Sequence, residues 1–410
     1  MSVSSPAPAA SAAPAMSPAL IVFVLSLLLG LQPVTTDLYL PALPGLTESL
    51  GATLAQAQLT LSALLLAFGL SQLVWGPLSD RYGRRPVLLW GLGAYVLASV
   101  ASTLAPTMEA LILARILQGA AMGAAVMCAR AIVRDLYRPV DGARVMSKGL
   151  TGLGVIACLS GPLGGLLAGW AGWRVALLAP AVFAAGALAL VALRFQESLA
   201  QKNPQALQPA TLLHTWRGIV RHPTFWAYSA LSAASYGGLF TVLASSSFVF
   251  IQVLGVSRPS YGLLMSSISG TYIVGTLICR RLLPRWGVQR TVAIAAGFTL
   301  TGGTLMGLFA LMGLHNGWAI MLPFYLFMLA HGVHQPCSQS GAVSPFPYSA
   351  GAASALNGFL MAATSFVMGS VLGQVMDGTV RPLMYGVCFW SVMIALSAWT
   401  LVQKHGKLPH

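Results

Sequence analysis

Long apolar runs alternate with short polar segments along the chain after residue 18. A transmembrane helix needs about 20 apolar residues, and twelve runs approach or exceed that length. They lie at 19–40, 56–77, 87–105, 109–132, 145–168, 174–194, 224–250, 260–281, 291–313, 317–338, 351–375 and 384–403. Only helices satisfy every backbone polar group in hydrocarbon at these lengths. The pattern predicts an all-α integral membrane protein with twelve transmembrane helices.

The longest polar interruption divides the twelve runs into two sets of six. Segment 282–290 (LLPRWGVQR) repeats the leucine, arginine, aromatic and glycine positions of segment 78–86 (LSDRYGRRP), but it lacks the acid. A central linker and an internal echo are typical of a transporter built from two parallel repeats. We expect a disordered tail at 1–18, six-helix bundles at 19–194 and 224–403, a cytoplasmic linker at 195–223 and a cytoplasmic tail at 404–410.

Charge is scarce and unevenly placed. The 410 residues are 57% hydrophobic and 7% charged, with a mean hydropathy of +0.78, whereas soluble domains carry about 25% charged residues. The net charge of +14 comes from clusters between apolar runs, which favours membrane orientation over nucleic-acid binding. If the N-terminus is cytoplasmic, 18 of the 22 basic residues fall inside, and only Arg174, Arg258 and Arg381 fall outside. The positive-inside rule therefore places both termini in the cytoplasm.

The segment Gly76–Pro86 (GPLSDRYGRRP) carries three basic residues and one acid within eleven positions between two apolar runs. We expect Gly76 and Pro77 to end one helix, Gly83 to adopt a conformation that other residues resist, and Pro86 to lie in the first turn of the next helix. The segment resembles the signature loop between helices 2 and 3 of the major facilitator superfamily, and every position of that pattern is filled.

The resemblance implies a conformational latch between the two bundles. In the family, the acid at Asp80 lies near the N-terminus of helix 11, where a helix dipole favours negative charge. The arginines pair with an acid at the end of helix 4, for which Asp135, or less favourably Asp141, is available. The alternative is a solvated loop that only sets orientation. The expected latch residues are Gly76, Asp80, Arg81, Gly83, Arg84, Arg85 and Asp135.

Asp37 is an acid within the first apolar run, bracketed by Pro33 and Pro41. An ionisable group at membrane depth costs about 2.5–3.5 kcal/mol, so such groups usually face the bundle interior or a water-filled cavity. Asp37 is therefore a candidate proton-coupling site or a ligand for a cationic substrate. The alternative is a hydrated residue at a helix end. The two prolines predict a broken helix, as transporter binding sites often have.

Arg115 is the cation deepest in any apolar run, and Gln118 and Met122 share its helical face. The sequence R-x-x-Q-G resembles a motif in helix 4 of proton-coupled exporters, in which the arginine lines the central cavity and takes part in proton transfer. The alternative is an arginine that only fixes helix packing. Tyr236 and Phe240 occupy helix 7, which lines central cavities of this fold. The expected substrate contacts are Asp37, Tyr39, Arg115, Gln118, Met122, Tyr236 and Phe240.

Small residues mark the fifth apolar run. Gly161, Gly165 and Gly169 recur every four residues and predict a smooth face for close helix approach. The run Gly161, Pro162, Gly164, Gly165 also resembles a motif of exporters rather than importers. A packing face without directional meaning is the alternative.

The helix 1 sequence TDLYLPALP, the loop signature and segment 129–136 (ARAIVRDL) together resemble the bicyclomycin and chloramphenicol resistance branch of the twelve-helix drug:proton antiporters. The resemblance implies a monomer of the bacterial inner membrane that exports small lipophilic compounds or antibiotics by alternating access. The proton-motive force would drive it without a cofactor, with Asp37 exchanging protons and Arg115 adjusting its proton affinity. Related exporters often carry a further acid two turns earlier, where this chain has Leu28, Leu29 and Gly30.

Three other functions stay open from the sequence. A transporter of one specific metabolite would share the fold, and a non-transporting receptor would need no buried polar residues. An integral-membrane enzyme is disfavoured because H-E-x-x-H, G-x-S-x-G and paired intramembrane carboxylates are missing from the sequence. His331 and His334 share one helical face, but no third ligand is suitably spaced, so we expect no metal site.

Overall fold

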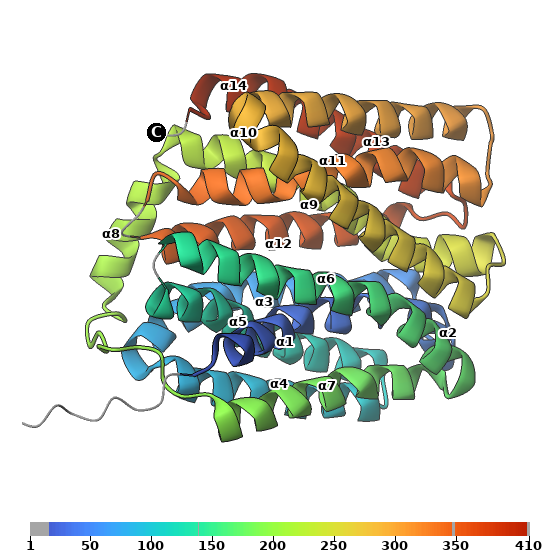
Figure 1. The fold of residues 1–410 in the computed structure, drawn as a ribbon. Coiled ribbons are helices and arrows are strands. Elements are labelled where there is room, and N and C mark those ends of the chain that lie inside the picture. The colour runs from blue at the N-terminus through green and yellow to red at the C-terminus, as the bar shows by residue number, and fades with distance from the viewer. Residues whose placement is uncertain (1–15, 138, 347–348, 408–410) are drawn as a thin grey trace, which may run out of the picture.

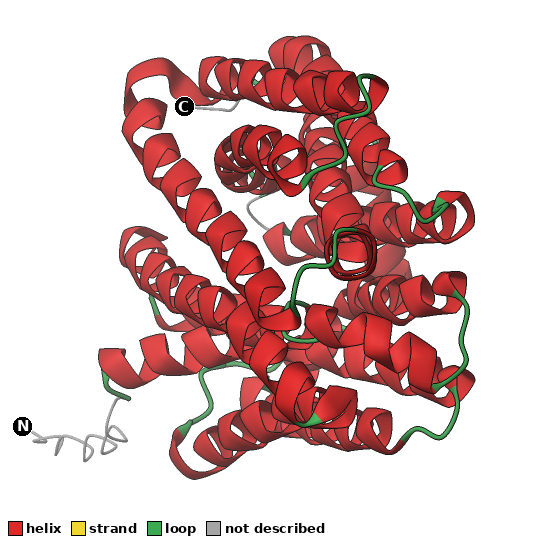
Figure 2. Ribbon diagram, turned by 90° about the vertical axis from the view of Figure 1, so that its right-hand side faces the viewer, coloured by secondary structure: helices red, strands yellow, loops and turns green. Residues whose placement is uncertain are grey.

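The described residues fold into two groups of long helices that run side by side. The structure is a computed structural model and describes residues 16–137, 139–346 and 349–407. In Figure 1 the first group (blue to green) lies below the second group (yellow to red). Figure 2 shows the described chain as helices and connecting loops. This arrangement is the all-α architecture that the hydropathy pattern predicts.

The two groups have matching sets of helices. The first contains α1 (Pro18–Thr36), α2 (Leu43–Ser49), α3 (Leu54–Tyr82), α4 (Arg84–Leu104), α5 (Met108–Leu136), α6 (Pro139–Trp170) and α7 (Gly172–Arg194). The second contains α9 (Pro223–Ser247), α10 (Arg258–Leu311), α11 (Gly317–Val343), α12 (Ala350–Val375), α13 (Arg381–Leu396) and α14 (Val402–His405). Between them lies α8 (Pro209–Val220). We call the end of the molecule that carries α8 the linker end, and the end that carries α2 the distal end (Figure 1).

Eleven helices of the described chain are long and apolar enough to cross a membrane, and α10 accounts for two crossings. At about 1.5 Å per residue, its 54 residues greatly exceed the roughly 30 Å hydrocarbon core. The backbone of α10 turns at Gly287, where φ is 67° and ψ is 175°. The predicted runs at 260–281 and 291–313 are therefore separate spans, and all twelve predicted spans are present.

The turn after α3 differs from the sequence prediction. α3 continues through Gly76 and Pro77 to Tyr82, so the prediction that these two residues end the helix was wrong. Proline removes only its own N–H from the ladder, and beyond the apolar part of the span water can satisfy the freed group. The turn consists of Gly83 alone, with φ 108° and ψ 162°. Pro86 lies in the first turn of α4, as predicted.

Gly83 and Gly287 occupy equivalent places in the two halves. They are the same residue in the sequence echo, and both have positive φ. Each joins two long helices at the linker end by a single non-helical residue. The internal repeat predicted from the sequence is therefore also present in the backbone geometry.

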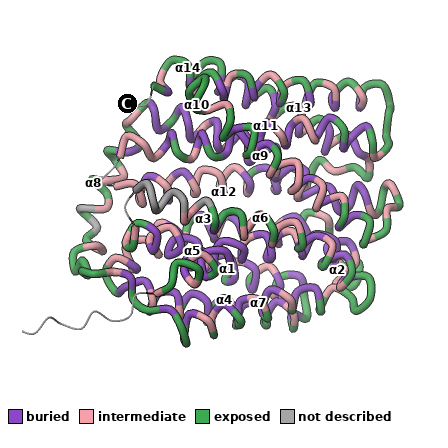
Figure 3. The backbone as a smooth tube through the Cα atoms, in the orientation of Figure 1, coloured by how far each residue is buried: buried purple, intermediate pink, exposed green. Residues whose placement is uncertain are grey.

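Glycines bring the two groups into contact. A Cβ on Gly161 of α6 would lie 2.8 Å from the Gly262 carbonyl oxygen of α10, and one on Gly165 would lie 2.5 Å from that of Arg258. On the other side of the molecule, Gly369 of α12 packs on Ser62 of α3. Figure 3 shows the buried positions concentrated where helices face one another. The expected packing role of Gly169 was wrong, because nothing lies within 4 Å of its Cβ position.

The linker contains a helix that the sequence did not predict. Residues Pro209–Val220 form α8 at the linker end (Figure 1). Proline at the first helical position starts a helix without losing a hydrogen bond, but the polar and proline-rich composition around it favoured a loop. The linker is thus partly ordered where it passes from one group of helices to the other.

The Gly83 turn predicts a stability test. We expect Gly83→Ala to lower the free energy of unfolding by about 1–3 kcal/mol, because its φ/ψ region is almost closed to residues with a Cβ. The Cβ would also meet the carboxylate of Glu197. Gly169→Ala is the matched control, with space for the methyl group. Fluorescence-detected thermal unfolding in detergent measures both variants, and equal unfolding temperatures would contradict this account.

Candidate functional site

α1 is broken at Asp37, as Pro33 and Pro41 predict. The helix ends at Thr36, residues 37–39 form a turn, and the chain continues as the 3-10 helix Leu40–Ala42 and then as α2. The Asp37 N–H donates to the Pro33 carbonyl oxygen at 2.8 Å. The membrane span as a whole extends to Ser49. Asp37 therefore lies between α1 and α2, within a helical stretch that runs from Pro18 to Ser49.

The Asp37 carboxyl lies where the two groups of helices meet. It is half-buried and accepts a hydrogen bond from Thr36 Oγ1 at 2.8 Å. It interacts electrostatically with Cys158 of α6, Tyr236 of α9 and Tyr261 of α10. Polar and ionisable side chains from both halves thus surround one carboxyl group.

Two further contacts fix the surroundings of Asp37. Gln32 Nε2 of α1 lies 3.5 Å from the Tyr236 hydroxyl oxygen of α9, which links the halves next to the carboxyl. Gly164 of α6 packs directly on the backbone of Leu38, where any side chain would collide with the Leu38 carbonyl group. One glycine of the predicted exporter motif therefore sets how closely α6 approaches the α1 break.

Arg115 is fully buried in α5 and is held by neutral partners. Its Nη1 donates to Gln118 Oε1 at 2.7 Å, and its Nη2 donates to the Thr35 carbonyl oxygen at 3.1 Å. The guanidinium carbon lies 4.3 Å from the centre of the Tyr39 ring. A helix end leaves carbonyl groups without intrahelical partners, and a guanidinium binds well both to carbonyl oxygens and to aromatic faces. Arg115 therefore binds both the last turn of α1 and the turn that follows it.

Hydrogen bonds extend this arrangement to neighbouring helices. Gln118 Nε2 donates to Ser99 Oγ of α4 at 2.7 Å. The Thr35 and Tyr95 hydroxyl oxygens are 2.6 Å apart, and those of Tyr39 and Thr60 are also 2.6 Å apart. These contacts connect α1, α3, α4 and α5 around Arg115. The buried polar groups form a network inside the first half of the molecule.

Asp37 and Arg115 belong to different surroundings. The ion pairs found among the described residues involve Arg84, Arg134, Asp80 and Asp135. Arg115 contacts residues 35 and 39, whereas Asp37 hydrogen-bonds to Thr36 and interacts with groups of α6, α9 and α10. The sequence suggested that Arg115 acts directly on Asp37, but the structure shows no contact between these two side chains. The two residues are connected instead through the backbone that joins residues 35 to 39.

The predicted substrate contacts differ in accessibility. Arg115, Gln118, Met122 and Phe240 have at most 1% of their surface exposed, as does Tyr39, and Tyr236 has 9%. Asp37 is the member of the set with clearly accessible surface, and Gln32 beside it is also half-buried. Contact with substrate stays a prediction for the buried members. Sequence reasoning missed Gln32, Cys158 and Tyr261, although a glutamine at membrane depth was a signal that could have been used.

A second cluster of charges lies at the linker end. The side chain of Arg84 is 1% exposed and forms ion pairs with Asp80 and Asp135, each with a shortest distance of 2.7 Å. Its Nη1 also donates to Ser79 Oγ at 2.7 Å. Arg134 lies 3.6 Å from Asp80. The predicted pairing of the signature arginines with Asp135 is therefore present for Arg84, and the side chain of Asp141 lies outside the described residues.

Glu197 completes the cluster from the linker. This residue lies in an exposed loop, and its carboxylate accepts hydrogen bonds from the backbone N–H groups of Arg84 and Arg85 at 2.8 and 3.1 Å. A negative charge at the start of α4 also interacts favourably with the helix dipole. The Arg85 side chain donates to the Ala192 carbonyl oxygen, and that of Arg81 lies over the Tyr82 ring.

The cluster reaches the second half through α5. Arg130 Nη1 donates to Ser354 Oγ of α12 at 2.8 Å, and Arg134 lies beside Gly351 at the start of that helix. Asp80 itself binds Arg84 and Arg134 of the first half. Contact between the halves is thus made by basic side chains of α5, and the latch role of Asp80 stays a prediction.

The two histidines of α11 are buried among neutral partners. His331 Nδ1 lies 2.8 Å from Ser235 Oγ, and His334 Nε2 lies 3.2 Å from Thr299 Oγ1. In the part of the chain that the structure describes, no group of three or more potential metal ligands is found. Both histidines serve helix packing in this arrangement.

Comparison with known proteins assigns the family. A sequence profile described as "Major Facilitator Superfamily" matches residues 20–370. The chain belongs to this superfamily. Facilitators are multi-pass membrane transporters of small molecules rather than enzymes.

Named relatives lie within this superfamily. The facilitator is 30% identical to a "Chloramphenicol resistance protein" of Pseudomonas aeruginosa, over 90% of this chain and 87% of the relative. It is 29% identical to "Multidrug resistance protein D" of Escherichia coli (strain K12), over 94% of this chain and 98% of the relative. Such names fit the branch that the helix 1 and loop motifs resemble.

Solved structures share the fold of this facilitator. A crystal structure of a D-xylose-proton symporter superposes with a TM-score of 0.75 at 16% identity, covering 95% of this chain and 99% of that one. The human organic anion transporter MFSD10 superposes with a TM-score of 0.66 at 20% identity, covering 94% and 100%. At these identities the likeness establishes the fold.

The linker-end cluster predicts unequal roles for adjacent arginines. We expect Arg84→Ala to destabilise the facilitator by about 3–5 kcal/mol, because it leaves the largely buried carboxylate of Asp135 without its partner. Arg85→Ala should cost about 1 kcal/mol or less, since its side chain makes an exposed hydrogen bond. Thermal unfolding of both variants measures the difference, and a stable Arg84→Ala protein would rule out the proposed ion-pair support.

Proposed function

We propose that this facilitator is a proton-coupled exporter of small lipophilic compounds, including antibiotics, across the bacterial inner membrane. Relatives that match most of the chain are named for chloramphenicol and multidrug resistance. Their organisms are bacteria. The matches cover 87% and 98% of these relatives, so the comparison concerns nearly whole transporters rather than a shared fragment.

One observation carries the coupling proposal. The Asp37 carboxyl is half-buried at the junction of the two halves, at a break in a transmembrane helix. An ionisable group at such a depth is costly and usually marks a substrate or proton pathway. Groups from α6, α9 and α10 act on it electrostatically. A movement of one half against the other therefore changes the environment of this carboxyl.

In the proposed cycle, Asp37 takes up a proton in the outward-open state and releases it to the cytoplasm. Proton and substrate would compete for the cavity between the halves. Arg115 would act as a positioning residue that holds Thr35 and Tyr39, so that the carboxyl between them moves with the first half. The proton gradient would supply the energy, and no cofactor is needed.

Orientation follows from the charge distribution. Arginines and lysines concentrate at the linker end, in agreement with the 18-to-3 division of the sequence. We place this end and both termini in the cytoplasm, and the distal end outside. The transporter would work as a monomer, since each half supplies part of the site around Asp37.

Asp37→Asn tests the coupling. We expect proton-driven efflux from proteoliposomes to fall at least tenfold, because an amide cannot carry the proton, while energy-independent substrate exchange continues. A susceptibility screen in a strain without its own pumps would first select the compound, with chloramphenicol in the panel. Glu48→Gln on the exposed face of α2 is the control. Full proton-driven efflux by Asp37→Asn would refute the coupling role.

Arg115→Lys tests the positioning role. Lysine keeps the charge but loses the planar fork that reaches Gln118 and Thr35 together and lies over Tyr39. We expect about a tenfold loss of efflux rate and a changed pH profile, with the protein still folded. Retention of the wild-type rate and profile would show that charge alone is sufficient at this position.

A further inference from the structure

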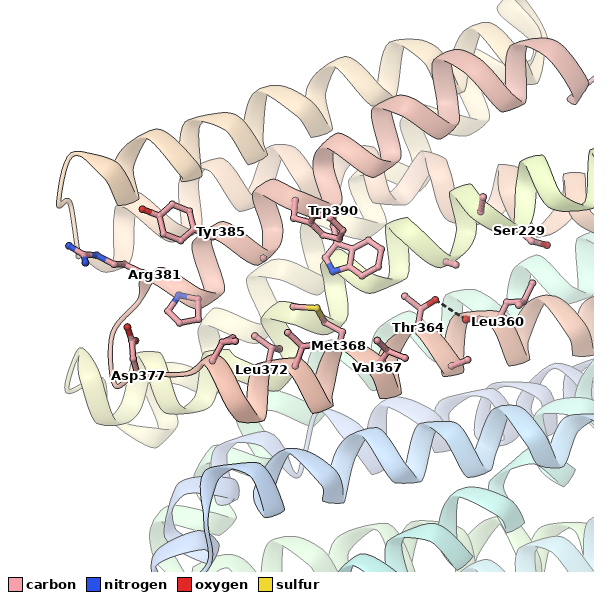
Figure 4. A pocket seen from close by; sticks show the side chains of 18 of the residues that line it. Ser229, Leu360, Thr364, Val367, Met368, Leu372, Asp377, Arg381, Tyr385 and Trp390 are labelled. Atoms are coloured by element: carbon pink, nitrogen blue, oxygen red, sulfur yellow. Dashed lines mark hydrogen bonds between the residues drawn. The ribbon is translucent and has the colours of Figure 1, made fainter.

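A groove of about 990 Å³ lies in the second half, away from Asp37. It runs between α9, α12 and α13, and nearly all its lining side chains are apolar. Figure 4 shows Val367, Met368 and Leu372 of α12 along one wall and Tyr385 and Trp390 of α13 along the other. Val367, Val371 and Val375 are 44–61% exposed. In a membrane-spanning chain, this surface faces the lipid.

The distal mouth of the groove carries both signs of charge. Asp377 and Arg381 both line it, in the connection from α12 to α13 (Figure 4). Within the part of the chain that the structure describes, the Arg381 guanidinium has no hydrogen-bond or ion-pair partner. It stands at the first residue of α13, where the helix dipole adds positive potential. The mouth can therefore bind an anion.

Asp377 offers a complementary negative site. Its Oδ1 accepts hydrogen bonds from Thr379 N at 3.0 Å and Thr379 Oγ1 at 2.7 Å. These bonds, with a smaller contribution from Arg381, hold the pKa of the Asp377 carboxyl below its ordinary value. The group thus stays charged at neutral and mildly acidic pH. Its second oxygen can accept a hydrogen bond from a primary amine.

The distal part of the groove, from Arg381 to Trp390, spans the depth of one lipid leaflet, and the lining continues toward the linker end to Leu360 and Trp226. Trp390 lies nine residues beyond Arg381 on α13, which is about 14 Å at 1.5 Å per residue. Half of the hydrocarbon core is about 15 Å. Tyr385 is one turn from Arg381 on the same face, at the level where a phospholipid carries its ester groups. From the mouth inward, the groove presents a charge, then a hydroxyl group, then an apolar wall. A phospholipid presents its phosphate, ester groups and acyl chain in the same order.

We propose that this groove binds one zwitterionic phospholipid of the outer leaflet, with a primary amine in its headgroup. Arg381 binds the phosphate, Asp377 binds the ammonium group, and an acyl chain lies along Val375, Val371 and Val367. This site is independent of the proposed transport function. It gives the second half a specific lipid contact at the distal end, where basic residues are few.

Lipid retention tests the site. Purified protein is delipidated, offered phosphatidylethanolamine, phosphatidylcholine or phosphatidylglycerol, and analysed by native mass spectrometry. We expect one phosphatidylethanolamine to be retained in preference to the other two lipids. Arg381→Ala should weaken its retention about tenfold, because a charge-assisted contact is lost. Asp377→Asn should abolish the preference for phosphatidylethanolamine over phosphatidylcholine.

Three variants serve as controls. Arg174→Ala removes an arginine from the same end of the other half, which hydrogen-bonds to Thr103 and Ala105, and should retain the lipid. Val371→Trp fills the groove while leaving both charges, and should prevent retention. Trp390→Phe removes an indole N–H without a partner among the described residues, and should have no effect.

Several outcomes would overturn the proposal. Equal retention of the three lipids, or unchanged retention in Arg381→Ala, would show that the mouth does not select a headgroup. Loss of retention in Trp390→Phe but not in Arg381→Ala would indicate a lipophilic molecule that hydrogen-bonds inside the groove. The readout is binding, so a failure of proton-driven efflux in the preceding experiments leaves it unchanged.

Discussion

The interaction on which the central site depends is the burial of Arg115 without a carboxylate. Taking a guanidinium fully out of water is costly and requires strong hydrogen-bond partners. Here the partners are an amide oxygen, a main-chain oxygen and an aromatic face, supplied by Gln118, Thr35 and Tyr39. Two of these three come from the first span: Thr35 lies in the last turn of α1 and Tyr39 lies in the turn that follows it. The break and the buried cation therefore stabilise each other.

This mutual support determines where Asp37 points. With residues 35 and 39 turned toward α5, the carboxyl between them faces α6, α9 and α10. Gly164 lets α6 approach the same turn closely, because even a methyl group would collide with Leu38. A network within the first half thus presents a carboxyl group to the second half. Coupling between the halves needs no ion pair between them in this arrangement.

The sequence predicted features that depend on local chemistry. Hydropathy predicted twelve spans, two prolines predicted the break at Asp37, and Gly83 was predicted at a turn, because each depends on nearby residues. Features that depend on distant neighbours were missed or misread. The bond from the Arg84 N–H to Glu197 joins residues 113 positions apart in the sequence. The main-chain partner of Arg115, the Thr35 carbonyl oxygen, comes from a helix 80 residues away in sequence.

Comparison of the two halves shows that the charged residues around Gly83 are not needed to form the turn. Gly83 and Gly287 both turn the chain with positive φ, yet Pro284 and Val288 occupy the positions of Asp80 and Arg84. In the second half, Gln289 Nε2 donates to the Val402 carbonyl oxygen, a neutral contact that joins the turn to its neighbour. The charged cluster of the first half must therefore contribute something besides turn formation. Its extension through α5 to Ser354 at the start of α12 places that contribution at the contact between the halves.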